Sequence, residues 1–251
     1  MDPLTETGAS ARFDHGVATH IGRRPNNEDA YRVAPELGLY AVADGLGGYE
    51  GGEIASDLAV GTLAEFIGAT HAPSNERLAF WENALIEATR LAHQRIRARQ
   101  VGPLAMMGTT LAAILVRDQT AIVCHVGDSR VYLLRNRELK QLTRDHTLYV
   151  EMLARGFEPG EDQRSIYANE LTRALGMEGN ADPDLAQVPM LAGDVFLLCT
   201  DGLYESLRDE QIAQVLEASS AQESCDRLVR QAYEQRGIDN MTALVVRVLD
   251  R

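Results

Sequence analysis

Mainly apolar runs that end beside an aspartate and a glycine recur three times in this sequence. The aspartates are Asp44, Asp128 and Asp201, which follow the runs at 39–43, 121–126 and 195–199. Short apolar runs bounded by glycine are typical of buried β-strands. A carboxylate after a buried strand lies at the edge of a sheet, where glycine lets the backbone approach a ligand closely. The recurrence therefore predicts buried strands that deliver acids to a sheet edge.

Two of these aspartates also have simpler explanations. Asp44 lies where a strand would turn into a helix and suits a helix cap, and Asp128 suits a turn. A fourth aspartate in a similar setting, Asp239, precedes the last apolar run at 242–249. Four converging carboxylates would repel one another without cations. Because no His or Cys ligand pattern accompanies them, Mg²⁺ or Mn²⁺ is favoured over zinc.

The rest of the pattern predicts an α+β fold. Apolar residues at helical spacing predict helices over 54–69, 78–96 with Ser74 as its N-cap, 209–216 and 221–236. The segment 108–143 alternates like an antiparallel meander. We therefore expect a four-layer α-β-β-α sandwich, in which two mainly antiparallel sheets are flanked by helix pairs. A short helix at 147–155, followed by polar residues, predicts a flap over about 145–170.

Length, charge and cysteine content argue against several classes of partner and location. The chain has 251 residues, 45% of them hydrophobic, so we expect one domain over 12–251 after a loose tail at 1–11. The formal net charge of −13 argues against a nucleic-acid or anionic-membrane partner. Three scattered cysteines and the lack of a signal-like start or a long apolar run predict a cytoplasmic protein with reduced thiols. No apolar stripe is left unassigned, so a monomer is expected.

Seven short motifs carry a family resemblance. They are R-x-x-N-E-D (24–29), A-D-G-L-G-G (43–48), G-T-T (108–110), G-D-S-R (127–130), L-T-R-A-L-G (171–176), T-D-G-L (200–203) and D-N-M-T (239–242). Over about residues 13–248 the set resembles the metal-dependent protein phosphatase family, called PPM or PP2C, in its compact bacterial form. The resemblance implies a protein serine/threonine phosphatase with two Mn²⁺ or Mg²⁺ ions at one end of a β-sandwich. Hydrolysis by a metal-activated water, without a phosphoenzyme, is also implied.

The resemblance assigns the metal ligands by position. Asp44 resembles the carboxylate that bridges both ions, and the Gly45 carbonyl would bind one of them. Asp201 and Asp239 would complete the coordination of the other ion. All three aspartates are thus expected to be essential for catalysis.

Further roles follow from the same resemblance. Glu28 resembles the acid that binds an ion through water, and Asp128 resembles part of a third-ion site of bacterial members. Asp29 and Asn240 would support the ligands without binding an ion themselves. Arg24 matches the phosphate-binding arginine and is also expected to be catalytic, since its planar guanidinium suits bidentate binding of phosphoryl oxygens.

One position departs from part of the family. Some members carry a His directly after the Asp-Gly pair as a general acid, and here that position is Leu46. The leading hypothesis is a phosphatase that opposes a bacterial serine/threonine kinase and acts on its phosphoprotein substrates. The alternatives are a catalytically silent phosphoprotein-binding or regulatory module of the same fold, and a phosphatase of small molecules.

Overall fold

Two antiparallel sheets form the centre of the computed structural model, which describes residues 13–46, 51–72, 77–179 and 181–250. The predicted tail at 1–11, the glycines at 47 and 48 and the predicted cap Ser74 lie outside the described residues. The first sheet, here the β1 sheet, has the order β1 (Phe13–His20), β11 (Met241–Val248), β10 (Val195–Cys199), β7 (Arg130–Arg135), β8 (Glu138–Gln141).

The second sheet, here the β3 sheet, packs face to face on the first. Its order is β2 (Asp29–Ala34), β3 (Leu39–Leu46), β5 (Leu111–Arg117), β6 (Thr120–Val126), β9 (Asp184–Pro189), and the short β4 (Gly108–Thr109) pairs with the end of β3. Neighbouring strands are antiparallel throughout both sheets. In the β1 sheet, β1 and β11 pair along their whole length, from Phe13 opposite Val248 to His20 opposite Met241.

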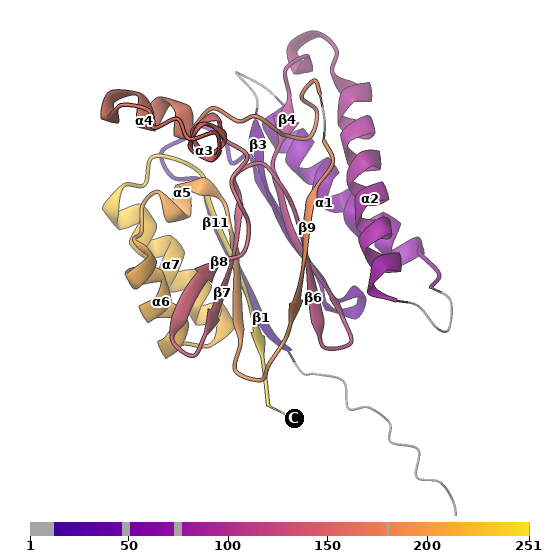
Figure 1. Ribbon diagram of the computed structural model, residues 1–251, viewed down its shortest axis with the longest axis vertical. Coiled ribbons are helices and arrows are strands. Elements are labelled where there is room, and N and C mark those ends of the chain that lie inside the picture. Colours follow the sequence, from indigo (N-terminus) through magenta and orange to yellow (C-terminus); the bar gives the residue numbers. More distant parts are fainter. Residues whose placement is uncertain (1–12, 47–50, 73–76, 180, 251) are drawn as a thin grey trace, which may run out of the picture.

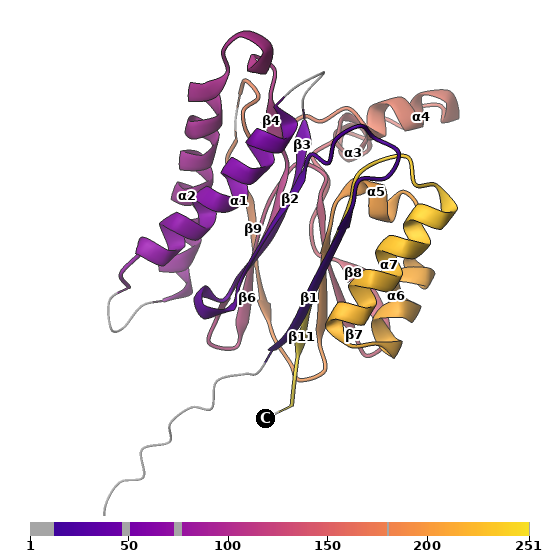
Figure 2. The same cartoon turned by 180° about the vertical axis from the view of Figure 1, so that it is seen from behind.

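Helix pairs cover both outer faces, as Figures 1 and 2 show. The β3 sheet is covered by α1 (Gly52–Ala69) and α2 (Leu78–Arg99), and the β1 sheet by α6 (Asp209–Ala218) and α7 (Ala221–Gln235). Shorter helices are α3 (Leu148–Ala154), α4 (Glu161–Ala168), α5 (Asp201–Tyr204) and the 3₁₀ turns η1 (Pro35–Leu37) and η2 (Gly102–Leu104). The predicted four-layer α-β-β-α sandwich is confirmed.

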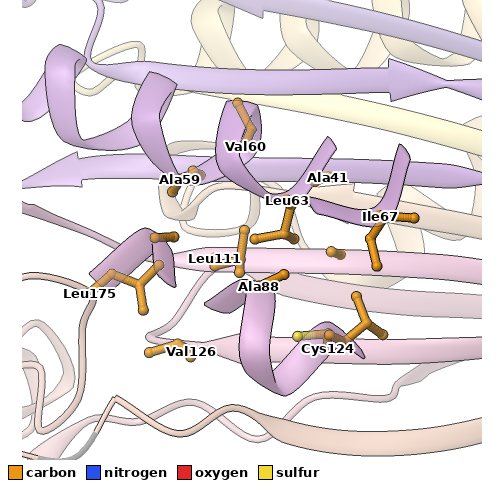
Figure 3. Close-up of a cluster of buried hydrophobic side chains, with 14 of the residues drawn as sticks. Ala41, Ala59, Val60, Leu63, Ile67, Ala88, Leu111, Cys124, Val126 and Leu175 are labelled. Carbon is orange, nitrogen blue, oxygen red and sulfur yellow. The ribbon is translucent and has the colours of Figure 1, made fainter. Parts of the chain in front are cut away.

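Period-two alternation along the strands creates three apolar layers. On β3, Leu39, Ala41 and Ala43 face α1 and α2, whereas Tyr40 and Val42 face the other sheet. Figure 3 shows the outer layer, where Ala41 and Leu111 of the sheet lie with Leu63, Ile67 and Ala88 of the helices. These side chains are fully or almost fully buried, and truncating a buried leucine in such a layer costs about 2–5 kcal/mol.

The same alternation fixes where the polar residues lie. The position after Val42 on the inner face of β3 is Asp44, and Asp29 is its paired residue on β2. Inner-face positions of β5, β10 and β11 likewise continue, beyond their apolar residues, into Thr110, Thr200 and Thr242. One end of the layer between the sheets is therefore polar, because the inner-face residues of these strands change from apolar to polar at the same end of the sandwich.

The structure differs from the sequence analysis in three local features. The segment 108–143 is not one meander, because the chain crosses between the sheets after β6, leaving β5–β6 in one sheet and β7–β8 in the other. The polar residues after α3 contain a further helix, α4, whose first turn follows Gly160. Strand β9 was not predicted, because its pattern of partly exposed residues lacks a long apolar run.

Candidate active site

A cavity of about 470 Å³ opens at the polar end of the sandwich. Its lining combines residues from six separate parts of the chain: Arg24, Pro25, Asn26, Glu28, Asp44, Gly45, Leu46, Asp128, Asn169, Leu171, Asp201, Asp239 and Asn240. The structure thus brings together every site residue expected from the sequence except Asp29, which lies directly behind the lining. The histidines at 20, 93 and 125 are not part of the lining.

Asp44 is held by a rigid backbone frame. Its N–H donates to Thr110 Oγ1 at 2.9 Å, and its carbonyl accepts from the Thr110 N–H at 2.9 Å and from Thr109 Oγ1 at 2.8 Å. Thr110 Oγ1 in turn lies 2.7 Å from Ser129 Oγ. The Gly-Thr-Thr motif therefore acts as a clamp that fixes the end of β3 and aims the Asp44 carboxylate into the cavity.

Glycine is required beside Asp44 because two chain segments meet there. A Cβ on Gly45 would lie 2.3 Å from the Gly52 carbonyl oxygen and 2.6 Å from that of Glu28. A Cβ on Gly52 would lie 2.4 Å from Glu28 Oε2. The Gly45 N–H also donates to the Glu28 carbonyl at 3.1 Å, which Ser56 Oγ contacts at 2.6 Å. This close approach leaves the Glu28 side chain at the edge of the cavity.

Asp29 supports the site from behind. Its Oδ2 accepts hydrogen bonds from Thr200 Oγ1 at 2.9 Å and Thr242 Oγ1 at 2.7 Å, so it joins β2 to β10 and β11 across the two sheets. Its Oδ1 is buried and has no hydrogen-bond partner within the described part of the chain. Burial raises the pKa of Asp29 to about 7, with smaller contributions from the charges of Asp201 and Asp239.

The acids in the cavity disturb one another's ionisation. Burial raises the pKa of Asp44 well above its ordinary value, and the charge of Asp201 adds to this. Burial likewise raises the pKa of Asp201 to about 6, with the charge of Asp239 adding to it. Asp128 behaves like Asp44, since burial and the charge of Asp201 raise its pKa. Each ionised carboxylate in this cavity therefore destabilises the folded state unless a cation neutralises its charge.

Arg24 and Asp239 form an ion pair at the mouth of the cavity. Arg24 Nη2 lies 2.5 Å from Asp239 Oδ2, and the two side chains are 54% and 35% exposed. The hydrogen bond to Asp239 raises the pKa of Arg24. The guanidinium is thus placed over the acidic cluster while still accessible to a ligand.

Asn240 fixes the loop that carries Arg24. Its Nδ2 donates to the carbonyls of Ile21 at 2.8 Å and Asn26 at 2.9 Å, and its Oδ1 accepts from the Glu28 N–H at 2.8 Å. One buried side chain thereby holds both ends of the loop between β1 and β2. The role of support expected for Asn240 fits these contacts.

A set of side-chain contacts that supports the backbone at Asp128 was not predicted from the sequence. Arg130 binds both carboxylate oxygens of Asp145, with shortest distances of 3.0 and 2.6 Å, and its guanidinium lies 3.6 Å from the centre of the Tyr204 ring. Tyr204 Oη donates to the Asp128 carbonyl at 3.1 Å. The Asp-Ser-Arg motif contained the signal, but its partners lie far along the sequence at positions that no local pattern marks.

The donor set suits hard divalent cations. Carboxylate oxygens and the Gly45 carbonyl surround the cavity, and the lining contains no His or Cys. Asp201 Oδ1 is buried and has no hydrogen-bond partner among the residues that the structure describes, so one oxygen of the cluster is left for a ligand. Among the described residues, no three acidic, His or Cys side chains already stand where they would hold one ion together. Both carboxylate oxygens of Asp239 already have partners, Oδ2 with Arg24 and Oδ1 with the Asn240 N–H, so an ion bound by Asp239 would compete with these contacts.

Comparison with known proteins places this geometry in a family. Residues 18–245 match the family model described as protein phosphatase 2C. The serine/threonine phosphatase stp of Listeria monocytogenes is 33% identical over 241 residues, which cover 95% of this chain and 94% of that protein. The serine/threonine protein phosphatase PstP of Mycobacterium tuberculosis is 37% identical over 248 residues, covering 96% of this chain and 45% of PstP. The chain therefore spans just under half the length of that relative.

Solved structures of similar proteins indicate the same family. The catalytic domain of PstP in complex with two manganese ions is 35% identical, with a TM-score of 0.83, and the match covers 96% of this chain and 100% of that one. PppA, described as a key regulatory component of the type VI secretion system in Pseudomonas aeruginosa, is 34% identical with a TM-score of 0.78, covering 94% and 98%. Together with the family match over 228 of the 251 positions, from 18 to 245, these likenesses show that the chain belongs to the protein phosphatase 2C family.

Proposed function

We propose that this chain is a metal-dependent protein serine/threonine phosphatase that hydrolyses phosphoserine and phosphothreonine at the cavity. The observation that carries the proposal is the convergence of Asp44, Asp128, Asp201 and Asp239 on one cavity with Arg24 at its mouth. Relatives of similar length bear the name serine/threonine phosphatase, which supports the same activity.

The acids would hold two Mn²⁺ or Mg²⁺ ions. Asp44 would bridge them, the Gly45 carbonyl would bind one, and Asp201 and Asp239 would bind the other. Glu28 would act through water, and Asp128 would contribute to a third site. When bound, such ions lower the pKa of water and neutralise charge on a phosphoryl group. The two manganese ions of the PstP catalytic domain support this assignment.

The chain's own groups supply positioning. Arg24 would bind phosphoryl oxygens through its guanidinium, and Asn240 keeps the Arg24 loop in place through three hydrogen bonds. Asp29 ties the sheets together under the acids. Leu46 has no proton to give, so the leaving serine or threonine oxygen receives its proton from another group in the cavity.

The wider setting follows from this activity. Phosphorylated proteins are the proposed substrates, a bacterial serine/threonine kinase is the proposed opposing enzyme, and the cytoplasm is the proposed location. We further propose that residues 12–251 act as one monomeric catalytic domain, with the segment 145–170 as a flap beside the cavity. None of the helices in the described residues combines the length and apolar character needed to cross a bilayer.

Initial rates test the proposal. Hydrolysis of p-nitrophenyl phosphate and of a phosphothreonine peptide is measured with Mn²⁺, with Mg²⁺ and with EDTA, for the wild type and for Asp44→Asn. Asp57→Asn, which removes an exposed carboxylate on α1, is the matched control. Since the ions supply several kcal/mol of transition-state stabilisation, Asp44→Asn is expected to lower the rate by about 100-fold or more.

Three results would contradict the proposal. Unchanged metal-dependent activity in Asp44→Asn would remove this acid from the chemistry. A folded wild type without turnover in any metal would favour the silent phosphoprotein-binding module, and turnover of phosphorylated metabolites but not of peptides would favour a small-molecule phosphatase.

A further inference from the structure

An exposed apolar surface adjoins the mouth of the cavity on the side of Arg24. It consists of Ile21, Tyr233 and Ile238, here called the apolar rim, whose residues are 38%, 41% and 58% exposed. Ile21 lies three residues before Arg24, and Ile238 directly precedes Asp239. Single exposed apolar residues are ordinary, but these three come from two loops and a helix that meet beside one cavity.

The loops that carry the apolar rim are locked to each other. A Cβ on Gly22 would lie 2.0 Å from the Asp239 carbonyl oxygen, so the residue after Ile21 touches the backbone of the residue after Ile238. The Ile21 carbonyl also accepts the 2.8 Å hydrogen bond from Asn240. The apolar rim is therefore a fixed surface rather than a chance exposure of loose loops.

Tyr233 extends this surface from α7. Its ring makes a tilted contact with His20, with centroids 4.4 Å apart, and its side chain would meet any Cβ placed on Gly237 at 3.0 Å. Tyr233 is 41% exposed despite these contacts, so part of its side chain remains free to bury an incoming side chain.

The size of the cavity indicates which part of a substrate would lie on the apolar rim. A volume of about 470 Å³ accommodates one phosphorylated side chain and its ions, but not the polypeptide that carries it. With the phosphoryl group on Arg24, the residues next to the phosphorylated position must cross the rim of the cavity. On this side Ile21 and Ile238 expose apolar surface to solvent, so an apolar neighbour that packs on them would be desolvated without burying either of these positions against a charge of its own.

We propose that the apolar rim is a substrate subsite that binds an aliphatic or aromatic residue close in sequence to the phosphorylated serine or threonine. This inference rests on the proposed function. The subsite makes this chain select phosphoproteins that have an apolar residue beside the phosphorylation site. Arg24 and the acids bind the phosphoryl group, which all phosphoprotein substrates have in common.

Peptide pairs test this subsite. Phosphothreonine peptides that differ only in having Leu or Ser at each flanking position are compared by kcat/KM for the wild type. Burying one such side chain corresponds to a preference for Leu of about 10-fold at one flanking position. Ile238→Ser, and more so the double variant Ile21→Ser/Ile238→Ser, should reduce this preference towards 1 while Ile238→Leu keeps it.

Controls separate the subsite from the chemistry. Leu191→Ser removes an exposed leucine of the turn after β9, away from the cavity, and should leave the preference unchanged. The rate on p-nitrophenyl phosphate, which has no flanking residues, should stay within about twofold in the rim variants and also shows that they are folded.

The outcomes are distinct. A wild type that hydrolyses all peptides with no preference for Leu, or a preference that survives in the double variant, overturns the subsite but leaves the proposed function standing. A folded wild type that hydrolyses neither p-nitrophenyl phosphate nor any peptide overturns the proposed function and the subsite together.

Discussion

Replacing Asp201 by asparagine should stabilise the protein in EDTA, even though it removes a proposed metal ligand. Burial raises the pKa of Asp201 from 3.8 to about 6, so the folded chain binds a proton more tightly than the unfolded chain. Above pH 6 the carboxyl is ionised in both states, and its ionisation lowers the free energy of unfolding. At about 1.4 kcal/mol for each pH unit, the rise corresponds to at most about 3 kcal/mol.

The sign of the effect depends on pH. Below about pH 4 the Asp201 carboxyl is protonated in both states, and an asparagine should then change the free energy of unfolding little. As pH rises from about 4 to 6 the wild type loses stability through this group, and the variant does not. Asp29, with a pKa of about 7, acts in the same direction in both proteins. The difference between variant and wild type should thus grow from near zero to its full value at pH 8.

Urea unfolding measures this difference. With EDTA at pH 8 the Asp201→Asn variant should be more stable by up to about 3 kcal/mol, or about 6–12 °C in Tm for a chain of this size. Mn²⁺ at 100 times its dissociation constant should raise the stability of the wild type by about 2.7 kcal/mol and that of the variant by much less. Asp57→Asn again serves as the control for loss of an exposed charge. A variant that is less stable at pH 8, or whose advantage is equal at pH 4 and pH 8, would refute the reasoning.

Two further substitutions probe the frame of the site. Gly45→Ala places a methyl group 2.3 Å from the Gly52 carbonyl oxygen, and because the obstacle is backbone the protein should lose about 1–3 kcal/mol of stability in urea together with metal-dependent activity; a fully stable, active variant would mean that the two segments separate easily. Arg130→Ala leaves the Asp145 carboxylate, which is 10% exposed, without its bidentate partner, so a loss of about 3–5 kcal/mol is expected in the same assay; a loss below about 1 kcal/mol would show the pair to be weak.

The layers of this fold and most of its site could be predicted because both depend on local periodicity. Alternation along β3 places Asp44 on the inner face, and equivalent positions on other strands place Thr200 and Thr242 at the same level. The crossing between sheets after β6 could not be predicted, because β6 and β7 have the same apolar pattern and only the pairing of β7 with β10 reveals the crossing.

The contacts that hold the acids were beyond sequence reasoning for a different reason. The Arg130–Asp145 pair spans 15 positions, and the hydrogen bond from Tyr204 to Asp128 spans 76. Tyrosines and arginines with such partners look the same in the sequence as those on the surface. The separation of partners along the chain, and not any weakness in the motifs, limits what the sequence tells about the support of the site.

The full-length pairing of β1 with β11 has a consequence for attachments to this chain. Met241, which directly follows the cavity residue Asn240, pairs with His20, and Val248 pairs with Phe13 at the opposite end of the two strands. Eight residues of strand span about 25 Å. A group tethered after Val248 by a flexible linker needs about 20 residues before its root-mean-square reach equals that distance. Short fusions at this end therefore leave the mouth of the cavity free, and only a long tether raises the local concentration of an attached phosphopeptide there.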